Sequence, residues 1–498
     1  MTGQLAAALA AATLVTGCGS TVAGSAQHSS GTSGLGASDH SGVNGTSPVG
    51  TASTDSTQLS LPGGLHGGTS GSGRNERDPG AAPTSGSPSS VGGTAGSIGP
   101  GTAPVPVGFY VAKDTGAAAA ALGDSALSSG NGANQARVAV ALVNAAGGLN
   151  GHPMKPVIVE DDATGDQDTQ AQRACDTFFQ DNHVVAVVSG LWQPVLVSCS
   201  NKHGVPFVTG GSASTSRSIL DQFPLGVLID QPLYDSVASS LIPSLVDRGW
   251  LSSMPTDPVV IGLIYTDLPD FAGVPAEVKA ALRAAGLSLK DQVAMPALNG
   301  TNFQEAVSAG ESAALHFKSD GVSRVLVIDQ GGTGVAYFSL AARQLDYYPH
   351  YGATSLSQMS VWSTGMSPQQ LDGAAGLGWE PVWDVSLSNQ PPGTAHTRSC
   401  VEAMRRAGEH TDVQFTRANA MATCEGAYLL AAAWRRQQLT GAGFLTGLNA
   451  LGTRYPPVTA LSTNFASHRA GADRARPMTY QQKCNCFIYA GGERRLRQ

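Results

Sequence analysis

The chain is poor in aromatic and charged residues. Phe, Trp and Tyr make up 6% of its 498 residues, and Asp, Glu, Lys and Arg together make up 13%. Both fractions are low for a packed globular protein, and the 62 glycines point the same way. The length suffices for two or three domains, so we expect folded domains together with a segment that does not pack into any core.

A surplus of basic residues is also missing. The formal net charge is -7, whereas nucleic acids and anionic membranes are recognised by basic patches. The basic run Arg494, Arg495 and Arg497 is short and is typical of a solvated tail. No stretch reaches the roughly 18–20 apolar residues that a membrane span needs. We therefore expect no nucleic-acid partner and no transmembrane segment.

The motifs of common enzymes are absent as well. The sequence has no G-x-S-x-G elbow, no H-E-x-x-H and no convincing Ser/His/Asp set. Its Cys and His residues do not follow zinc-ligand spacings. The sequence therefore predicts a protein that is not an enzyme and uses no cofactor and no metal.

The N-terminus has the features of an export signal. An apolar run from Leu5 to Val15 has the length of a signal-peptide core. It leads into Leu14-Val15-Thr16-Gly17-Cys18, which resembles the lipobox of bacterial lipoproteins. We expect residues 1–17 to be a signal peptide and Cys18 to carry a lipid anchor to the cell membrane. No Lys or Arg precedes the apolar run, so either the true start lies upstream or the signal is atypical.

The segment that follows is rich in Gly, Ser, Thr and Pro. Residues 19–103 contain no aromatic side chain, so they cannot bury enough apolar surface to offset the entropy of ordering. We expect residues 18–104 to be a disordered tether. Its root-mean-square reach is roughly 50 Å, which lets a folded domain sit away from the membrane.

From residue 105 onward, short apolar runs alternate with helical patterns. Runs of about five apolar residues alternating with helices of ten to fifteen predict an α/β fold with parallel sheets. Two such series, joined near residues 230–235, indicate two Rossmann-like lobes connected by a hinge. The strands are expected at 105–111, 156–160, 184–188, 206–208, 259–265, 293–297 and 325–328, and the helices at 134–146, 166–180, 195–202, 275–285, 303–317 and 335–345.

One stretch is specific enough to indicate a family. Val107-Gly108-Phe109 and Thr115-Gly116 precede Asn144-Ala145-Ala146-Gly147-Gly148-Leu149-Asn150-Gly151, and Asp161-Asp162 follows. This order resembles the type I periplasmic-binding-protein family, in the branch of branched-chain amino-acid-binding proteins. Gly147-Gly148 would end the helix in a left-handed cap, and Asn150-Gly151 would turn the chain into the next strand.

The resemblance implies a hinged, extracytoplasmic clamp that captures a small polar ligand. Its implied partner is a membrane permease of the ABC type, and we expect the binding protein to be a monomer. Lobe 1 is expected at 105–230 and 388–455, and lobe 2 at 231–387 and 456–498. An alternative within the same fold is a ligand sensor or structural envelope lipoprotein without a transport role.

In this family the loops after the third and fourth strands of lobe 1 hold the polar head of the ligand. Hydroxyls and backbone amides suit an anion without a buried counter-charge. Trp192 either covers the ligand or packs on the hinge. The matching residues here are Ser189, Trp192, Gln193, Gly211, Ser212 and Ser214.

In lobe 2 the corresponding strand ends supply Asp267, Phe271, Asp329, Gln330 and Ser355. Amino-acid-binding members usually have a Tyr at the first of these strand ends and an acidic residue near the third. This chain has Phe271 and Thr354-Ser355 at these positions instead. Asp267 or Asp329 would then have to hold an ammonium group.

Six cysteines follow Cys18, and an even number in an exported protein predicts disulfides. Six allow fifteen pairings, among which we favour local ones: Cys175 with Cys199, Cys400 with Cys424, and Cys484 with Cys486.

A competing motif remains in lobe 2. Asp329-Gln330-Gly331-Gly332-Thr333-Gly334 is similar to the phosphate loop of sugar kinases. Glycine there lets backbone amides approach a phosphate, but it equally allows a tight turn from strand to helix. An exported lipoprotein has no ATP supply, so we favour the turn.

Overall fold

The computed structural model describes residues 103–113, 128–162, 165–211, 213–253, 258–297, 302–363 and 365–497. All of them belong to one compact unit. The predicted signal peptide, Cys18, nearly all of the predicted tether and Ser212 lie outside the described residues. Among the described helices, none combines the length and apolar character that spanning a bilayer requires.

The strands form two sheets, as the alternating pattern predicted. In the first sheet the strand order is β2-β1-β3-β4-β5, and every pairing is parallel. Its strands are β1 (Val105–Ala112), β2 (Met154–Asp161), β3 (Val187–Ser189), β4 (Phe207–Thr209) and β5 (Gly226–Leu228).

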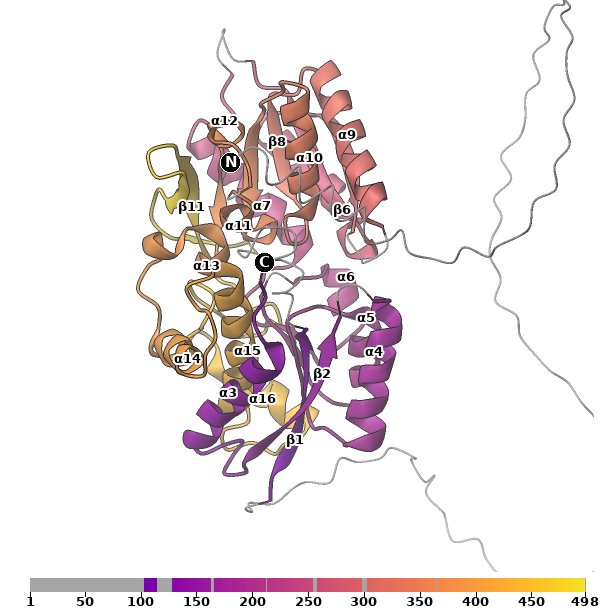
Figure 1. The fold of residues 1–498 in the computed structure, drawn as a ribbon, viewed down its shortest axis with the longest axis vertical. Coiled ribbons are helices and arrows are strands. Elements are labelled where there is room, and N and C mark those ends of the chain that lie inside the picture. Colours follow the sequence, from indigo (N-terminus) through magenta and orange to yellow (C-terminus); the bar gives the residue numbers. More distant parts are fainter. Residues whose placement is uncertain are drawn as a thin grey trace, which may run out of the picture. The chain divides into compact units, whose positions relative to one another are not determined.

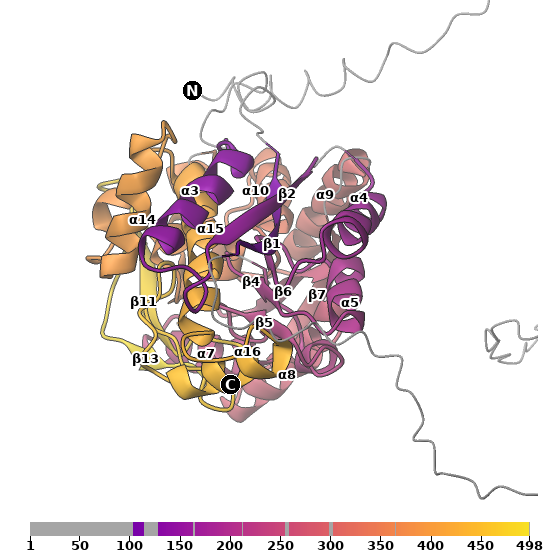
Figure 2. The same cartoon turned by 90° about the horizontal axis from the view of Figure 1, so that it is seen from below.

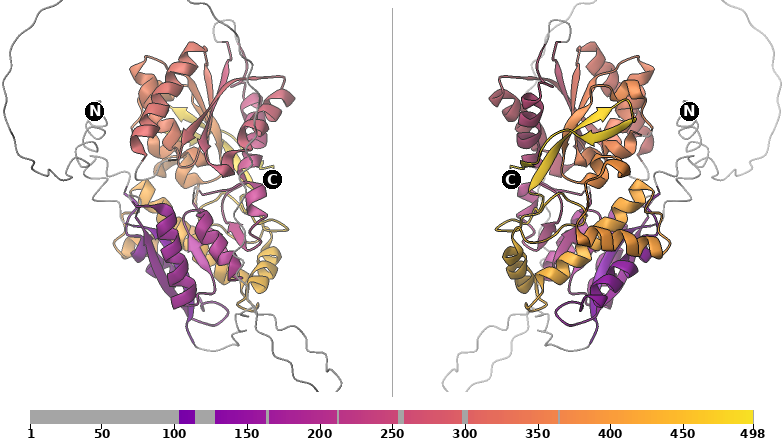
Figure 3. Two further views of the ribbon diagram at one scale, coloured as in Figure 1. Left: turned by 90° about the vertical axis from the view of Figure 1, so that its right-hand side faces the viewer. Right: turned by 90° about the vertical axis from the view of Figure 1, so that its left-hand side faces the viewer.

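The second sheet has the order β12-β11-β10-β9-β8-β6-β7, with β13 beside β11. Strands β6 to β10 pair in parallel, and the C-terminal strands add to this sheet in antiparallel fashion. They appear in yellow across the front of the second lobe in the right-hand view of Figure 3. The strands are β6 (Ile261–Asp267), β7 (Leu289–Pro296), β8 (Arg324–Ile328), β9 (His350–Thr354), β10 (Ala375–Gly378), β11 (Arg474–Gln481), β12 (Cys486–Tyr489) and β13 (Arg494–Arg495).

The basic run at the C-terminus is not a free tail, contrary to our prediction. Arg494 and Arg495 form β13, paired with β11. The guanidinium of Arg494 lies 2.6 Å from Oδ2 of Asp247, and that of Arg495 lies 3.3 Å from Oδ1 of Asp473. Backbone pairing and two carboxylates therefore hold the run against lobe 2.

Helices cover both faces of each sheet, and apolar clusters fill the layers between them. Figure 1 shows the two lobes, and Figure 2 shows α4 and α5 on one side of β1 and β2 with α3, α14 and α15 on the other. The helices of lobe 1 are α3 (Gly132–Ala145), α4 (Gln167–Cys175), α5 (Pro194–Lys202), α6 (Arg217–Leu220), α14 (Ala395–Arg406), α15 (Gln414–Ala433) and α16 (Gly441–Leu451). Those of lobe 2 are α7 (Tyr234–Asp247), α8 (Val274–Ala284), α9 (Phe303–Ser319) and α10 (Thr333–Gln344), with the short α11 (Met359–Trp362) and α12 (Pro368–Leu371).

The helix predicted at 166–180 differs in its last part. It is α-helical only to Cys175 and continues as a π-helical segment, Asp176–Asp181. The wider turn buries the adjacent rings of Phe178 and Phe179 together, and Phe178 lies against Gly108 of β1.

The turn that carried the family resemblance has the predicted backbone. Gly147 and Gly148 have φ values of +104° and +69°, and the amide of Gly148 donates to the carbonyl of Val143 at 2.9 Å. Asn150 and Gly151 also have positive φ, at +49° and +88°. The left-handed cap that ends α3 is confirmed.

The chain crosses between the lobes three times. Crossover 1 is residues 229–233, crossover 2 is residues 379–394 and crossover 3 is residues 452–473. Crossover 2 contains the short helix α13 (Pro381–Asp384). The predicted lobe boundaries at 230, 387 and 455 each fall inside one of these crossovers.

The six cysteines form the three local disulfides that we favoured. Cys175 joins α4 to Cys199 of α5, and Cys400 joins α14 to Cys424 of α15. Cys484 and Cys486 close a ring at the turn between β11 and β12. The first two therefore tie neighbouring helices together on opposite faces of the lobe 1 sheet.

Candidate functional site

The register of the first sheet brings the ends of three strands side by side. Tyr110 of β1 pairs with Ser189 of β3, and Ser189 pairs with Thr209 of β4. The loops that follow β3 and β4 therefore start from one edge of the sheet. In open parallel sheets this carboxyl edge is where ligands bind.

The loop after β3 is held by its own side chains. The Ser189 hydroxyl accepts from the amide of Leu191 at 3.0 Å and donates to the carbonyl of Leu191 at 2.8 Å. Gln193 caps α5, because its Oε1 accepts from the amide of Val195 at 3.1 Å. Between them, Gly190 is exposed, and the side chain of Leu191 is 39% exposed.

Trp192 packs inside lobe 1. Its ring lies edge-on to Phe207 and Phe223, with centroid distances of 5.9 and 6.2 Å, and the residue is 6% exposed. Its indole Nε1 is buried and has no hydrogen-bond partner among the residues that the structure describes. In this structure Trp192 is a core residue of lobe 1. It neither packs on the hinge nor lies exposed where it would cover a ligand.

The loop after β4 is tied to crossover 1. Gly211, with φ of +82°, donates its amide to Oδ2 of Asp230 at 2.9 Å. Ser214 donates its hydroxyl to the carbonyl of Pro232, and its amide lies 3.4 Å from the hydroxyl of Tyr234. The structure therefore brings Gly211 and Ser214 to the hinge, with their polar groups occupied.

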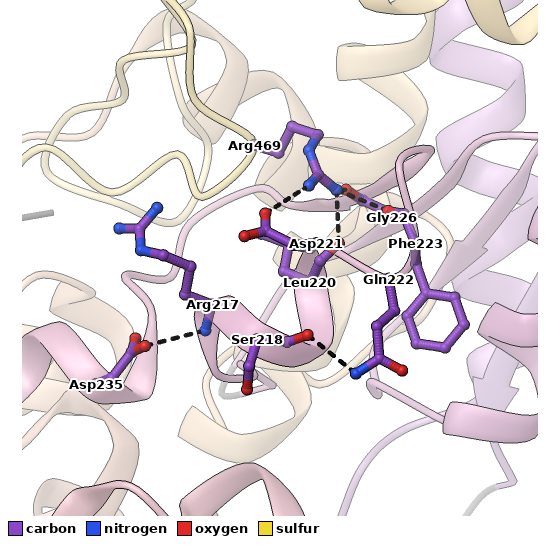
Figure 4. A network of polar contacts seen from close by, with 9 residues as sticks. All are labelled: Arg217, Ser218, Leu220, Asp221, Gln222, Phe223, Gly226, Asp235 and Arg469. Atoms are coloured by element: carbon purple, nitrogen blue, oxygen red, sulfur yellow. Dashed lines mark hydrogen bonds and ion pairs between the residues drawn. The ribbon is translucent and has the colours of Figure 1, made fainter.

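Arg469 of crossover 3 holds the next part of this loop (Figure 4). Its Nη1 donates to the carbonyls of Leu220, Phe223 and Gly226 at 3.0, 2.6 and 3.1 Å. Its Nη2 lies 3.2 Å from Oδ1 of Asp221. One guanidinium thus joins three carbonyls of residues 220–226, of which those of Leu220 and Phe223 also accept from the amides of Phe223 and Gly226.

In lobe 2 the first strand end presents one exposed and one buried residue. Asp267 is exposed at the end of β6. Phe271 is fully buried, with its ring centroid 3.8 Å from that of Tyr234. Phe271 therefore belongs to the core around α7.

The glycine-rich loop after β8 turns the chain into α10. Gly331 and Gly332 both have φ of +72°, and Oδ2 of Asp329 accepts from the amide of Val335 at 3.1 Å. Asp329 is 1% exposed, and burial raises its pKa to about 6. Gln330 is half-buried, and its backbone amide donates to the hydroxyl of Thr266 at 2.8 Å. The tight turn into α10 therefore explains the glycines of this loop without a bound phosphate.

Ser355 is fully buried beneath crossover 2. Its hydroxyl oxygen accepts from the amides of Trp379 and Glu380 at 2.8 and 3.3 Å. Of the predicted side chains that the structure describes, Asp267 and Gln330 therefore remain accessible at the strand ends, and the others are buried or engaged in turns.

Four buried acids near the crossovers were missed in the sequence. We name Asp230, Glu380, Asp384 and Glu425 the hinge carboxyl cluster, and none is more than 1% exposed. Burial raises the pKa of Asp230 to about 6 and that of Asp384 to about 7. Burial, followed by the charge of Asp230, raises the pKa of Glu425 to about 7 and that of Glu380 well above its usual range.

Two other features of the described residues lie away from these strand ends. A cavity of about 550 Å³ is lined by crossover 2, α14, α15 and crossover 3, including Arg398, Arg417 and Thr459. Asp291, His316 and Asp320 have ligand atoms within 4.8 Å of one another, an arrangement of metal-ligand types that the sequence spacing did not indicate. His316 already contacts Asp291 at 3.2 Å and Lys290 contacts Asp320 at 3.9 Å, so these groups pair without an ion.

Comparison with known proteins identifies the family to which this architecture belongs. The family profile described as periplasmic binding protein matches residues 105–483, which is most of the chain. The chain belongs to the periplasmic binding protein family. The family consists of solute-binding proteins of ABC transporters rather than enzymes, and it implies an extracytoplasmic location.

Solved structures agree on the fold of this periplasmic binding protein. An ABC transporter substrate-binding protein from Desulfitobacterium hafniense in complex with Leu has 16% identity and a TM-score of 0.53, covering 78% of this chain and 100% of its own. A branched-chain amino acid ABC transporter protein from Thermus thermophilus with bound valine has 14% identity and a TM-score of 0.55, with 79% and 97% covered. A solute-binding protein from R. palustris in complex with 4-hydroxybenzoate has 11% identity and a TM-score of 0.56, with 78% and 96% covered. A search of curated proteins found no match.

Proposed function

We propose that this periplasmic binding protein is a lipid-anchored receptor that captures a small polar ligand, such as an amino acid or amide, between its lobes for an ABC-type importer. The observation that carries the proposal is the pair of sheets, each with parallel strands, joined by three crossovers. Each sheet ends its strands in loops that contain hydroxyl, amide or glycine residues. Such strand ends are the general ligand site of open α/β sheets.

The accessible groups at these ends suit a zwitterionic or amide ligand. The exposed carboxylate of Asp267 is available to an ammonium or amide N–H group, and the Gln330 side chain offers both donor and acceptor. The exposed side chain of Leu191 offers apolar surface beside the loop after β3. The ligands named for the three related structures all carry a carboxylate, which backbone amides of glycine-containing loops can hold.

A thermal-shift screen of the full chain tests this proposal. The panel is amino acids, amides, short peptides, sugars and 4-hydroxybenzoate. A ligand at 100 times its Kd should stabilise the folded state by about 2.7 kcal/mol. We expect a shift with an amino acid or amide, and the absence of a shift with every compound would contradict the proposal.

Two matched variants then locate the site. Asp267→Asn should weaken binding of the hit at least tenfold, because it removes the charge that faces the ligand cation. Asp412→Asn, at a residue whose side chain is 86% exposed on lobe 1, should leave affinity unchanged. Equal affinities in the two variants would remove Asp267 from the site.

The anchor and the partner have separate tests. Cys18→Ala should shift the expressed protein from the detergent phase to the aqueous phase in phase partitioning. A permease and an ATPase encoded beside the gene would support import, whereas their absence together with ligand binding would favour a sensor.

A further inference from the structure

The hinge carboxyl cluster connects all three crossovers. Asp230 lies in crossover 1, while Glu380 and Asp384 lie in crossover 2. Glu425 projects from α15 and accepts from the amides of Val458 and Thr459 of crossover 3 at 2.5 and 2.8 Å. The cluster therefore sits where the lobes move relative to each other when a two-lobed clamp closes.

Within the cluster, two carboxyl groups from different crossovers are direct neighbours. The carboxyl of Asp230 lies within hydrogen-bonding distance of that of Glu380. Two ionised carboxylates only accept, so this contact is a hydrogen bond only when one of them carries a proton. Oδ1 of Asp230 and Oε1 of Glu380 are buried and accept no hydrogen bond from any donor of the described residues.

The other donors near the pair cannot replace this shared proton. Gln231 donates its Nε2 to Oε2 of Glu380 and to the carbonyl of Gly211, while its Oε1 accepts from the indole of Trp379 at 3.0 Å. The Thr459 hydroxyl lies 2.5 Å from Oδ2 of Asp230 and 2.9 Å from Oε2 of Glu425, but it has a single hydrogen to donate.

The charged and titratable groups around the cluster do not neutralise it. In the described part of the chain, no Lys, Arg or His side chain forms a hydrogen bond or ion pair with any of the four acids. Tyr489 of β12 donates to Asp384 at 2.7 Å, and the guanidinium of Arg476 lies 4.8 Å from the Tyr489 ring centroid. Tyr455 of crossover 3 donates its hydroxyl to the backbone carbonyl of Glu425 at 3.2 Å.

We propose that Asp230 and Glu380 share one proton that locks crossover 1 to crossover 2, and that losing it loosens the hinge. Loss of the proton turns a hydrogen bond into a contact between two like charges in a buried site. This repulsion favours separation of crossover 1 from crossover 2. The device therefore sets how readily the lobes open, in response to pH. It does not depend on which ligand the protein binds.

The electrostatics of the pair give the direction of the switch. Burial, followed by the neighbouring Asp230 carboxylate, raises the pKa of Glu380 well above its usual range, so the pair keeps its proton to a higher pH than an exposed carboxyl group does. Because the two groups interact strongly, they titrate as a pair. The lock is therefore closed at low pH and opens as the pH rises.

Hydrogen exchange of the full chain between pH 6 and pH 9 tests the lock. After correction for intrinsic exchange rates, protection of crossovers 1 and 2 should fall at least tenfold in the wild type. Glu380→Gln keeps a neutral donor opposite Asp230, so its protection should fall less than threefold. Glu402→Gln, at an exposed acid of α14, should behave as the wild type. Constant protection in the wild type, or the same fall in Glu380→Gln as in the wild type, would overturn the proposal.

A second measurement needs no variant and so does not depend on Glu380→Gln folding. Infrared spectroscopy of the wild-type full chain should show a protonated-carboxyl stretch at pH 7 that disappears on raising the pH to 9. A spectrum without this band at pH 7 would overturn the shared proton.

Discussion

Oγ1 of Thr459 lies 2.5 Å from Oδ2 of Asp230, and this contact joins the third crossover of the chain to the first. The same hydroxyl lies 2.9 Å from Oε2 of Glu425, which is fully buried on α15. One threonine thus links two hinge segments to the helix that packs on the lobe 1 sheet.

Removing this hydroxyl should destabilise the protein without changing its shape. Thr459→Val keeps the side-chain volume but removes the hydroxyl donor between the two carboxyl groups, leaving only the backbone amides that bind them. The loss of such a buried hydrogen bond costs about 1–3 kcal/mol. Urea denaturation measures the change. Thr446→Val, at an exposed position of α16, should change stability by less than about 0.5 kcal/mol. Equal effects of the two variants would remove Thr459 from the hinge network.

Arg469 should stabilise the loop between α6 and β5. Arg469→Met keeps the aliphatic stem but removes the guanidinium that donates to the carbonyls of Leu220, Phe223 and Gly226. We expect a loss of about 2 kcal/mol, with faster hydrogen exchange in residues 220–228. Arg405→Met, at a side chain that is 65% exposed, is the control. Unchanged exchange in Arg469→Met would contradict this role.

The disulfides should contribute unequally to the stability of the fold. Cys400 and Cys424 are separated by 24 positions, so removing their bond should cost about 3.5 kcal/mol on the chain-entropy model. Cys484 and Cys486 are separated by 2 positions, and the same model gives about 1.6 kcal/mol. Alanine pairs at each site, compared by guanidinium denaturation, test the order. A larger loss at the short ring would contradict it.

Stability should decrease as the pH rises from 5 to 8. The pKa values of Asp230, Asp384 and Glu425 are raised to about 6, 7 and 7 in the folded protein, so the folded state binds more protons than the unfolded chain in this range. Their contribution to the free energy of unfolding is complete below the pKa values of the unfolded chain, near 4. It is lost as the pH passes the pKa values of the folded protein, and the loss is on the order of 3 kcal/mol for one such group.

Denaturant titrations at each pH measure this slope, and Glu425→Gln should flatten it. His396 acts in the opposite direction, because burial lowers its pKa, but it is one half-buried group against several fully buried acids. A free energy of unfolding that rises steadily from pH 5 to 8 would show that the acids are not protonated in the fold.

Sequence patterns predicted the two-lobed architecture because it depends on local periodicity. Runs such as Arg324–Ile328 are buried throughout, and their apolar sequence indicates a central parallel strand. The helix end at Gly147-Gly148 was predictable because only a left-handed cap explains paired glycines there. The antiparallel pairing of β11, β12 and β13 and the π-helical turn before Asn182 depend on tertiary packing, which local pattern does not encode.

The site was harder to predict, since side-chain direction in a loop is set by distant neighbours. Ser355 and Phe271 stand at the expected strand ends, but the first is covered by Trp379 and Glu380 and the second by Tyr234. Their roles as ligand contacts stay predictions. Glu425, a lone acid in an apolar helix, was the signal in the sequence that could have revealed the hinge carboxyl cluster.

Calorimetric titration of the full chain with the amino acids and amides of the panel tests the central claim most directly. Ligand capture between two lobes of one chain predicts saturable binding of at least one of these compounds, with one ligand per chain. Titrations that give no binding heat with any of them at several temperatures would contradict the account.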